Sequence, residues 1–150
     1  MSDLRDLYQQ TILDHTRKPR NRHEMPDATA SADGHNPLCG DKITLYLKVK
    51  NGVIEDISFT GSGCAICTAS SSMMTEALKG KTVAQGQRLF DQFHSMLTSP
   101  MDQETSFAQL DKLAVFSGVR EFPVRVKCAT LPWHTLQAAL KNEHHPVSTQ

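Results

Sequence analysis

The stretch DKITLYLKVKNGVIEDISFTGSG, residues 41–63, decides the fold. On both sides of Asn51-Gly52 apolar residues alternate with polar ones, a pattern typical of strands with one buried face. Asn-Gly favours a tight hairpin turn because both residues tolerate positive φ. The stretch therefore predicts two antiparallel strands. Their apolar positions are Ile43, Leu45, Leu47 and Val49, then Val53 or Ile54, Ile57 and Phe59.

Helical patterns surround this hairpin. An amphipathic helix is expected within residues 1–20, ending before Pro19. A second helix follows the hairpin over 64–80 and stops at Gly80, and a third runs over 82–99 with Thr82 as its cap. The last helix is expected over 131–143, with Thr130 or Leu131 near its start and Pro132 in its first turn.

Two segments lack a strong periodic signal. Residues 21–40 are rich in small and turn-forming residues, which predicts a connection with at most a short strand, and 101–113 reads as a loop or short helix. Strands and helices are thus segregated along the chain. This order predicts an α+β fold, a small antiparallel sheet of about three strands with helices on one face. Residues 1–150 form a single domain by length, and 141–150 are expected to be a frayed tail.

Charge and hydropathy exclude several classes of function. Lys plus Arg number 16 and Asp plus Glu number 16, so the net charge is zero and no long like-charged run occurs. Neither nucleic acid nor an anionic membrane is therefore an expected partner. The first residues lack the features of a secretory signal, and no apolar run approaches the roughly 20 residues that span a bilayer. A cytoplasmic protein is expected.

The main functional lead is the set of four cysteines. Cys39 precedes the hairpin's first strand and Cys64 follows its second, so an antiparallel pairing brings Cys39, Asp41 and Cys64 to one end of the sheet. If the last helix begins against that end, Cys128 joins them. Three thiolates and a carboxylate suit tetrahedral zinc. A helix N-terminus, expected at both Cys64 and Cys128, would also lower the pKa of a thiol.

Cys67 admits two interpretations. With Cys64 it forms a C-x-x-C at a helix start, which is compatible with a redox dithiol or with two ligands of one metal. Thioredoxin-like chemistry would require a parallel βαβ pattern around the pair, and the sequence shows none there. The favoured interpretation is that Cys67 is a small buried hydrophobic residue.

Four longer motifs carry a family resemblance. They are LYQQTILDHTRKPRN (7–21), NPLCGDKI (36–43), GSGCAICTASSSMMTE (61–76) and FPVRVKCATLPWHTL (122–136). With them the chain resembles the U-type scaffold family of iron–sulfur cluster assembly, also known as the IscU or NifU N-terminal family, whose fold is IscU/SufE-like. It is most similar to the SufU branch, because Lys127 stands where the IscU branch has a histidine and because it carries the longer segment Thr82 to Gly118.

The resemblance implies a function and a ligand set. It implies a zinc-dependent sulfurtransferase that accepts persulfide sulfur from a SufS-type cysteine desulfurase and passes it toward downstream SUF assembly proteins. By position, Cys39 is the sulfur acceptor, and it holds Zn²⁺ together with Asp41, Cys64 and Cys128. A further hypothesis is that the docked desulfurase supplies a ligand that replaces Cys39 on zinc. Two alternatives remain open: a scaffold that builds an iron–sulfur cluster on the same cysteines, and a structural zinc domain.

Basic residues near these motifs are weaker candidates. Arg125 and Lys127 flank Cys128, where Arg125 could stabilise a thiolate or contact an acidic desulfurase surface, or both could simply be solvated. Arg17, Lys18 and Arg20 form a short basic cluster that is either a partner-binding edge or a solvated face. His15 is expected to orient its motif, and Trp133 to be a core residue.

Overall fold

The computed structural model describes residues 2–37, 39–99, 108–141 and 147–148, without the side chains of 2–8, 108, 109, 111, 147 and 148. Its helices and strands are, in chain order, α1 (Ser2–Arg17), β1 (Ala30–Asn36), β2 (Asp41–Lys50), β3 (Val53–Ser62), α2 (Ala65–Leu78), α3 (Val83–Thr98), the 3₁₀ helix η1 (Ala108–Glu121), α4 (Pro123–Leu140) and β4 (Val147–Ser148).

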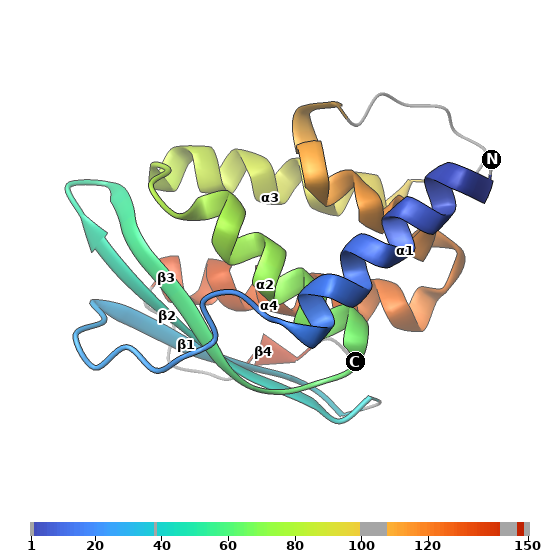
Figure 1. The fold of residues 1–150 in the computed structure, drawn as a ribbon. Helices are drawn as coiled ribbons and strands as arrows, with labels where there is room; N and C mark the ends of the chain where they lie inside the picture. Colours follow the sequence, from blue (N-terminus) through green and yellow to red (C-terminus); the bar gives the residue numbers. More distant parts are fainter. Residues whose placement is uncertain (1, 38, 100–107, 142–146, 149–150) are drawn as a thin grey trace.

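The sheet has the order β3-β2-β1-β4. The three long strands are antiparallel, and the two-residue β4 pairs with β1 in parallel. Asn51 and Gly52 have φ values of 54° and 76°, so the predicted hairpin turn is confirmed. Figure 1 shows the helices on one side of the sheet. The expected α+β class is therefore confirmed.

The core lies between the inner face of the sheet and helices α2 and α4. Leu45, Leu47 and Phe59 point inward from β2 and β3 and are almost fully buried. Trp133 of α4 is fully buried, as predicted, and stacks on Phe93 of α3 with ring centroids 4.7 Å apart. The expected helices over 64–80 and 82–99 are present as α2 and α3, and Thr82 caps α3 with Gln85 in a capping box.

The last helix differs from its prediction. It begins at Pro123 rather than near Thr130, so Pro132 lies in its interior. Proline at the first helical position loses no hydrogen bond, which explains the start, whereas an interior proline costs about 3 kcal/mol. The residues around Pro132 are buried from Cys128 to Trp133, and their burial offsets that cost.

Strand β1 is longer than the short strand expected within residues 21–40. It spans seven residues and pairs with β2 from Ala30↔Leu47 to Asn36↔Asp41. Its inward positions are Ala32, Gly34 and Asn36, which are small or polar and so lack the apolar alternation of an ordinary strand. Small residues are needed there because α4 packs closely: a Cβ at Gly34 would overlap Thr135 Oγ1.

Two predictions concern segments that the structure describes only in part. Of the expected loop or short helix at 101–113, residues 108–113 belong to η1 and the rest lie outside the described residues. Of the tail 141–150, expected to be frayed, Val147 and Ser148 instead pair with Gly34 and His35, and 142–146 and 149–150 lie outside the description.

The close contact between β1 and α4 yields a stability prediction. Gly34→Ala places a methyl group against Thr135 Oγ1 and 3.2 Å from Leu131 Cδ1. We expect the free energy of unfolding to fall by about 1–3 kcal/mol, the usual cost of overpacking. Chemical denaturation monitored by circular dichroism measures it.

Thr135→Ala provides the matched control. It removes the Thr135 hydroxyl, whose oxygen is the atom that clashes. In the unmodified chain this hydroxyl donates to the Leu131 carbonyl within the same helix at 2.8 Å. The double variant is expected to recover part of the stability lost in Gly34→Ala. Strictly additive losses would contradict the proposed contact.

Candidate metal centre

The ends of two hairpin strands meet at one edge of the sheet, as the sequence predicts. Asp41 is the first residue of β2, Lys42 pairs with Ser62 near the end of β3, and Cys64 follows two residues later. Cys39 lies just before Asp41, and the glycine between them has a φ of 73°. This positive φ lets the chain bend between the thiol and the carboxylate.

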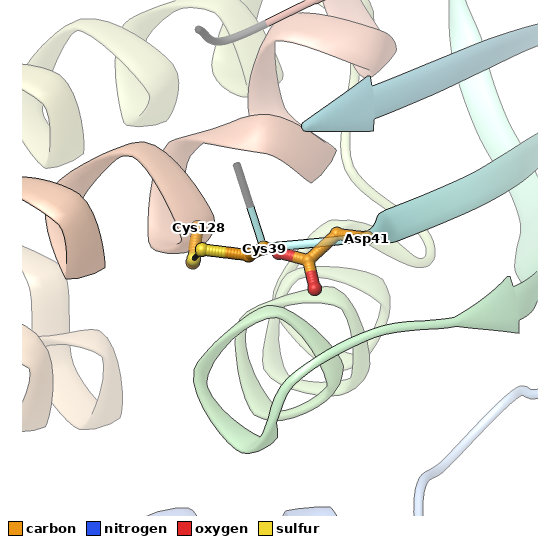
Figure 2. A group of neighbouring side chains, drawn as sticks. All are labelled: Cys39, Asp41 and Cys128. Carbon is orange, nitrogen blue, oxygen red and sulfur yellow. Dashed lines mark hydrogen bonds between the residues drawn. The ribbon is translucent and has the colours of Figure 1, made fainter. Parts of the chain in front are cut away.

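Cys128 reaches the same edge from α4. Its Sγ lies 3.2 Å from Cys39 Sγ, and the ligand atoms of Cys39, Asp41 and Cys128 all lie within 4.8 Å of one another. Figure 2 shows the two thiol groups facing each other beside the Asp41 carboxylate. Cys128 is the sixth residue of α4, so the expectation that it lies at a helix beginning is wrong. Cys128 reaches the site because of how α4 packs on the sheet, and not because it lies at the N-terminus of the helix.

Asp41 is fully buried and is held by the loop that leads into α2. The backbone N–H of Cys64 donates to Asp41 Oδ1 at 2.7 Å, and Cys64 Sγ lies 3.9 Å from Oδ2. Gly63 leaves room for this contact, since a Cβ there would lie 3.1 Å from Asp41 Oδ1. The carboxylate is thus fixed between β2 and the start of α2.

Cys64 is the N-cap of α2, as expected, and lies next to the three clustered ligand atoms. Its Sγ accepts the backbone N–H of Cys67 at 3.4 Å. Of the four predicted ligands, the structure thus brings the ligand atoms of Cys39, Asp41 and Cys128 together, whereas Cys64 lies outside this group and approaches it through Asp41 Oδ2.

The surroundings of the thiols are apolar. Ile43 and Leu131 are buried against Cys67 and Cys128, and Cys39, Cys64 and Ile66 pack on the same small cluster. Burial raises the pKa of the Cys128 thiol well above its ordinary value, and its hydrogen bond with Cys39 raises it further. A bound cation offsets such a shift, because a metal favours the deprotonated ligand.

The donor set fits zinc better than a hard cation. The group contains two sulfurs and one carboxylate, and with the neighbouring Cys64 sulfur it would match the ligands and number of a tetrahedral zinc site. Two thiolates on one tetrahedral zinc lie roughly 3.8 Å apart, and Cys39 Sγ and Cys128 Sγ lie 3.2 Å apart. A shift of about half an ångström would bring this pair to that spacing.

Cys67 is a buried structural residue, as the sequence favoured. Its side chain is fully buried, and burial, followed by the nearby Asp41 charge, raises its thiol pKa well above the ordinary value. A thiol that resists ionisation is a poor nucleophile for dithiol exchange.

The basic candidates lie outside the clustered ligand atoms. Arg125 is exposed and Lys127 half-buried on α4. Arg17 and Lys18 are exposed, whereas Arg20 forms an ion pair with Asp14 at 2.6 Å.

Asn36 is a site residue that sequence reasoning missed. It is fully buried at the end of β1, and its Nδ2–H donates to Cys128 Sγ at 3.8 Å. Its place in the NPLCGDKI motif was the available signal, but the contact with Cys128 depends on how α4 packs.

His15 anchors α1 to α2, which agrees with its expected orienting role. Its Nδ1 lies 2.7 Å from Ser72 Oγ, and that oxygen also accepts the backbone N–H of Arg20 at 2.8 Å. Which atom donates in the contact between His15 and Ser72 depends on the histidine tautomer, and His15 Nε2 lies 3.5 Å from Glu76 Oε1. Burial lowers the pKa of His15, and the Arg20 charge lowers it further.

Comparison with known proteins gives a consistent picture. The model of the family described as NifU-like N terminal domain matches residues 7–129. The chain is 37% identical over 142 residues, 95% of both chains, to the Bacillus subtilis protein named zinc-dependent sulfurtransferase SufU. It is 39% identical to the Streptococcus pyogenes iron-sulfur cluster assembly scaffold protein IscU, over 94% of this chain and 87% of that one.

A solved structure shares the fold. The crystal structure of a putative iron-sulfur cluster assembly scaffold protein for the SUF system, from Fervidobacterium islandicum AW-1, matches with a TM-score of 0.80 and 33% identity. The match covers 87% of this chain and 94% of that one. Among the helices of the described residues, none is long and apolar enough to cross a membrane.

The contact between Gly63 and Asp41 leads to a prediction on metal affinity. Gly63→Ala brings a methyl group to 3.1 Å from Asp41 Oδ1 and 3.2 Å from Cys67 Cβ. We expect the carboxylate to shift and zinc affinity to fall roughly tenfold or more, since misplacing a ligand or its support costs about that much. Competition with a chromogenic chelator measures the affinity.

Gly118→Ala is the matched control, because a Cβ there meets no atom within 4 Å. It should bind zinc as tightly as the unmodified chain. Equal affinities of the two alanine variants would contradict the expected effect of the Gly63 contact on zinc binding.

The buried His15 predicts a pH dependence of stability. Its pKa is lowered on folding from the ordinary value of 6.5, so below about pH 6.5 the unfolded chain binds a proton that the folded chain does not. The free energy of unfolding should fall as the pH decreases from 7.5 toward 5. His134, whose pKa is also lowered by burial, contributes in the same direction.

Urea denaturation across this pH range tests the assignment. His15→Asn should show a weaker dependence on pH than the unmodified chain, while Arg17→Gln, an exposed change two residues away, should keep the original slope. An unchanged slope in His15→Asn would mean that His15 does not titrate differently in the two states.

Proposed function

The chain belongs to the NifU-like N-terminal domain family of iron–sulfur cluster assembly, and from that premise we propose that it is a zinc-dependent sulfurtransferase. In this proposal Cys39 accepts persulfide sulfur from a SufS-type cysteine desulfurase and passes it toward downstream SUF assembly proteins. The reaction takes place in the cytoplasm, where a reducing environment keeps thiols available.

One observation carries the proposal: the clustered donor set combines a reachable thiol with two buried groups. Cys39 is half-buried, whereas Asp41 and Cys128 are buried. A sulfur acceptor must be approached by a partner's persulfide, and the buried members of the set are suited to holding a metal. Cys64 completes the proposed ligand set from the N-cap of α2.

The chemical step requires no external oxidant or reductant. The Cys39 thiolate attacks the outer sulfur of the desulfurase persulfide, a bond forms between Cys39 Sγ and that sulfur, and the partner's S–S bond breaks. The partner's cysteine leaves as a thiolate with the electron pair, and Cys39 carries the persulfide with its proton. Zn²⁺ bound to this set keeps its thiol ligands deprotonated at neutral pH.

Residues of this chain prepare Cys39 for the step. The Cys39 backbone N–H donates to the Asn36 carbonyl at 3.2 Å, which fixes the loop that carries the thiol. The positive φ of Gly40 turns the chain between Cys39 and Asp41. The thiol is therefore presented at the edge of the sheet while its neighbours remain packed.

A second function, a scaffold that builds an iron–sulfur cluster on these cysteines, is favoured by the names of relatives. The Streptococcus pyogenes and Thermotoga maritima relatives, 39% and 38% identical, are both named iron-sulfur cluster assembly scaffold protein IscU. Against it stands Lys127, because a lysine amine is a poorer cluster ligand than the histidine imidazole that the resemblance places there in the IscU branch.

Persulfide transfer distinguishes the candidates. Zinc-loaded protein is mixed with a SufS-type desulfurase and cysteine, turnover is followed, and the site of the added sulfur is located by mass spectrometry. We expect stimulated turnover with the unmodified chain, sulfur on Cys39, and at least a hundredfold loss of stimulation in a folded Cys39→Ala variant. Cys67→Ala, which removes a buried thiol outside the ligand set, should retain most of the stimulation.

The other outcomes identify the alternatives. A stable, stoichiometric visible cluster after anaerobic reconstitution, with no persulfide on Cys39, favours the scaffold. Unfolding of Cys39→Ala favours a structural zinc domain, because a structural metal contributes directly to folding.

A further inference from the structure

The three candidate sulfur ligands differ in the hydrogen bonds that they accept. From this difference we propose that Asn36 is a positioning residue that holds Cys128 as an unreactive ligand, so that Cys39 alone acts as the nucleophile. The inference rests on the proposed sulfur transfer, but its test does not require the desulfurase.

Asn36 contacts both Cys39 and Cys128, the two cysteines whose sulfurs lie 3.2 Å apart, through different groups. Its side-chain Nδ2–H donates to Cys128 Sγ at 3.8 Å, and its backbone carbonyl accepts the N–H of Cys39 at 3.2 Å. Asn36 and Cys128 are both fully buried, so water does not compete for the N–H···S contact. Asn36 also pairs with Asp41 across β1 and β2, which fixes its position in the sheet.

Cys64 is held by a different donor with the same effect. Its Sγ accepts the backbone N–H of Cys67 at 3.4 Å, at the positive end of α2. No substitution of residue 67 other than proline removes this donor. Cys64 therefore serves as an internal reference in any comparison of sulfur reactivity.

Cys39 lacks such a donor within the part of the chain that the structure describes. Its Sγ has one polar contact there, in which it accepts the thiol hydrogen of Cys128 at 3.2 Å, and this donor is lost when Cys128 is a deprotonated metal ligand. It is also half-buried, whereas Cys128 is fully buried. The lone pairs of a Cys39 thiolate thus meet a metal or a partner, but no amide hydrogen from the described residues.

An N–H···S hydrogen bond withdraws electron density from a thiolate. Hydrogen bonds to charged acceptors are stronger than neutral ones, particularly in a buried site, and a stabilised thiolate is a weaker nucleophile. One N–H donor therefore lowers the nucleophilicity of Cys128, and another lowers that of Cys64. The nucleophilicity of Cys39 is not lowered in this way. Removing the Asn36 amide should activate Cys128.

Alkylation of the zinc-loaded protein tests this order. Iodoacetamide is added in limiting pulses, and modification of each cysteine is quantified by mass spectrometry. The unmodified chain should react first at Cys39. In Asn36→Leu, which is similar in size but has no donor, the Cys128 rate should rise roughly three- to tenfold relative to Cys64, the effect of losing one hydrogen bond.

Two further variants at Asn36 complete the design. Asn36→Ala is a second donorless change, used if the leucine variant does not fold by circular dichroism, and Asn36→Gln retains an amide donor. The proposal requires that the glutamine variant stay closer to the original order than the donorless ones. Three results would overturn the proposal. They are the same order of cysteine alkylation in all variants, an equal rise in the alkylation rate of Cys64, and loss of zinc from the folded donorless variants.

Desulfurase assays on the same proteins separate the two proposals. Fast alkylation of Cys39 without any persulfide on it would refute the sulfurtransferase function and leave the role of Asn36 intact. Persulfide on Cys39 with no effect of Asn36 on alkylation would refute the present inference alone.

Discussion

The buried carboxylate of Asp41 is the constraint on which the rest of the site depends. A carboxylate that is ionised and removed from water is costly unless hydrogen-bond donors or cations surround it. The Cys64 N–H meets Oδ1 at 2.7 Å, and this bond ties the first residue of β2 to the N-cap of α2. The second oxygen is left facing the sulfurs, where a metal can satisfy it.

The contact between β1 and α4 adds the second half of the site. Gly34 allows α4 to approach the sheet so closely that a methyl group would overlap Thr135. This approach brings Cys128 to within 3.2 Å of Cys39 and against the Asn36 amide. Thiols of the same chemical type therefore come to lie in different surroundings, which is a physical basis for giving them different tasks.

Much of the fold could be predicted because the relevant signals are local. The Asn51-Gly52 turn, the alternation on either side of it and the Thr82 capping box depend on residues that are neighbours in the sequence. Strand β1 was underestimated because its inward residues are small to suit α4, which a local pattern does not reveal. The start of α4 was misplaced because a buried helix can retain an interior proline, Pro132, when packing offsets the cost.

By itself, the sequence determined which groups are available for chemistry and that Asp41 and Cys64 would meet, since the two ends of a hairpin lie side by side. Only the tertiary structure decided how Cys128 joins them, which thiol remains reachable and which sulfur the Asn36 amide contacts. The physical reason is separation along the chain. Cys128 lies 92 residues from Asn36, and the distance between them is set by how α4 packs on the sheet.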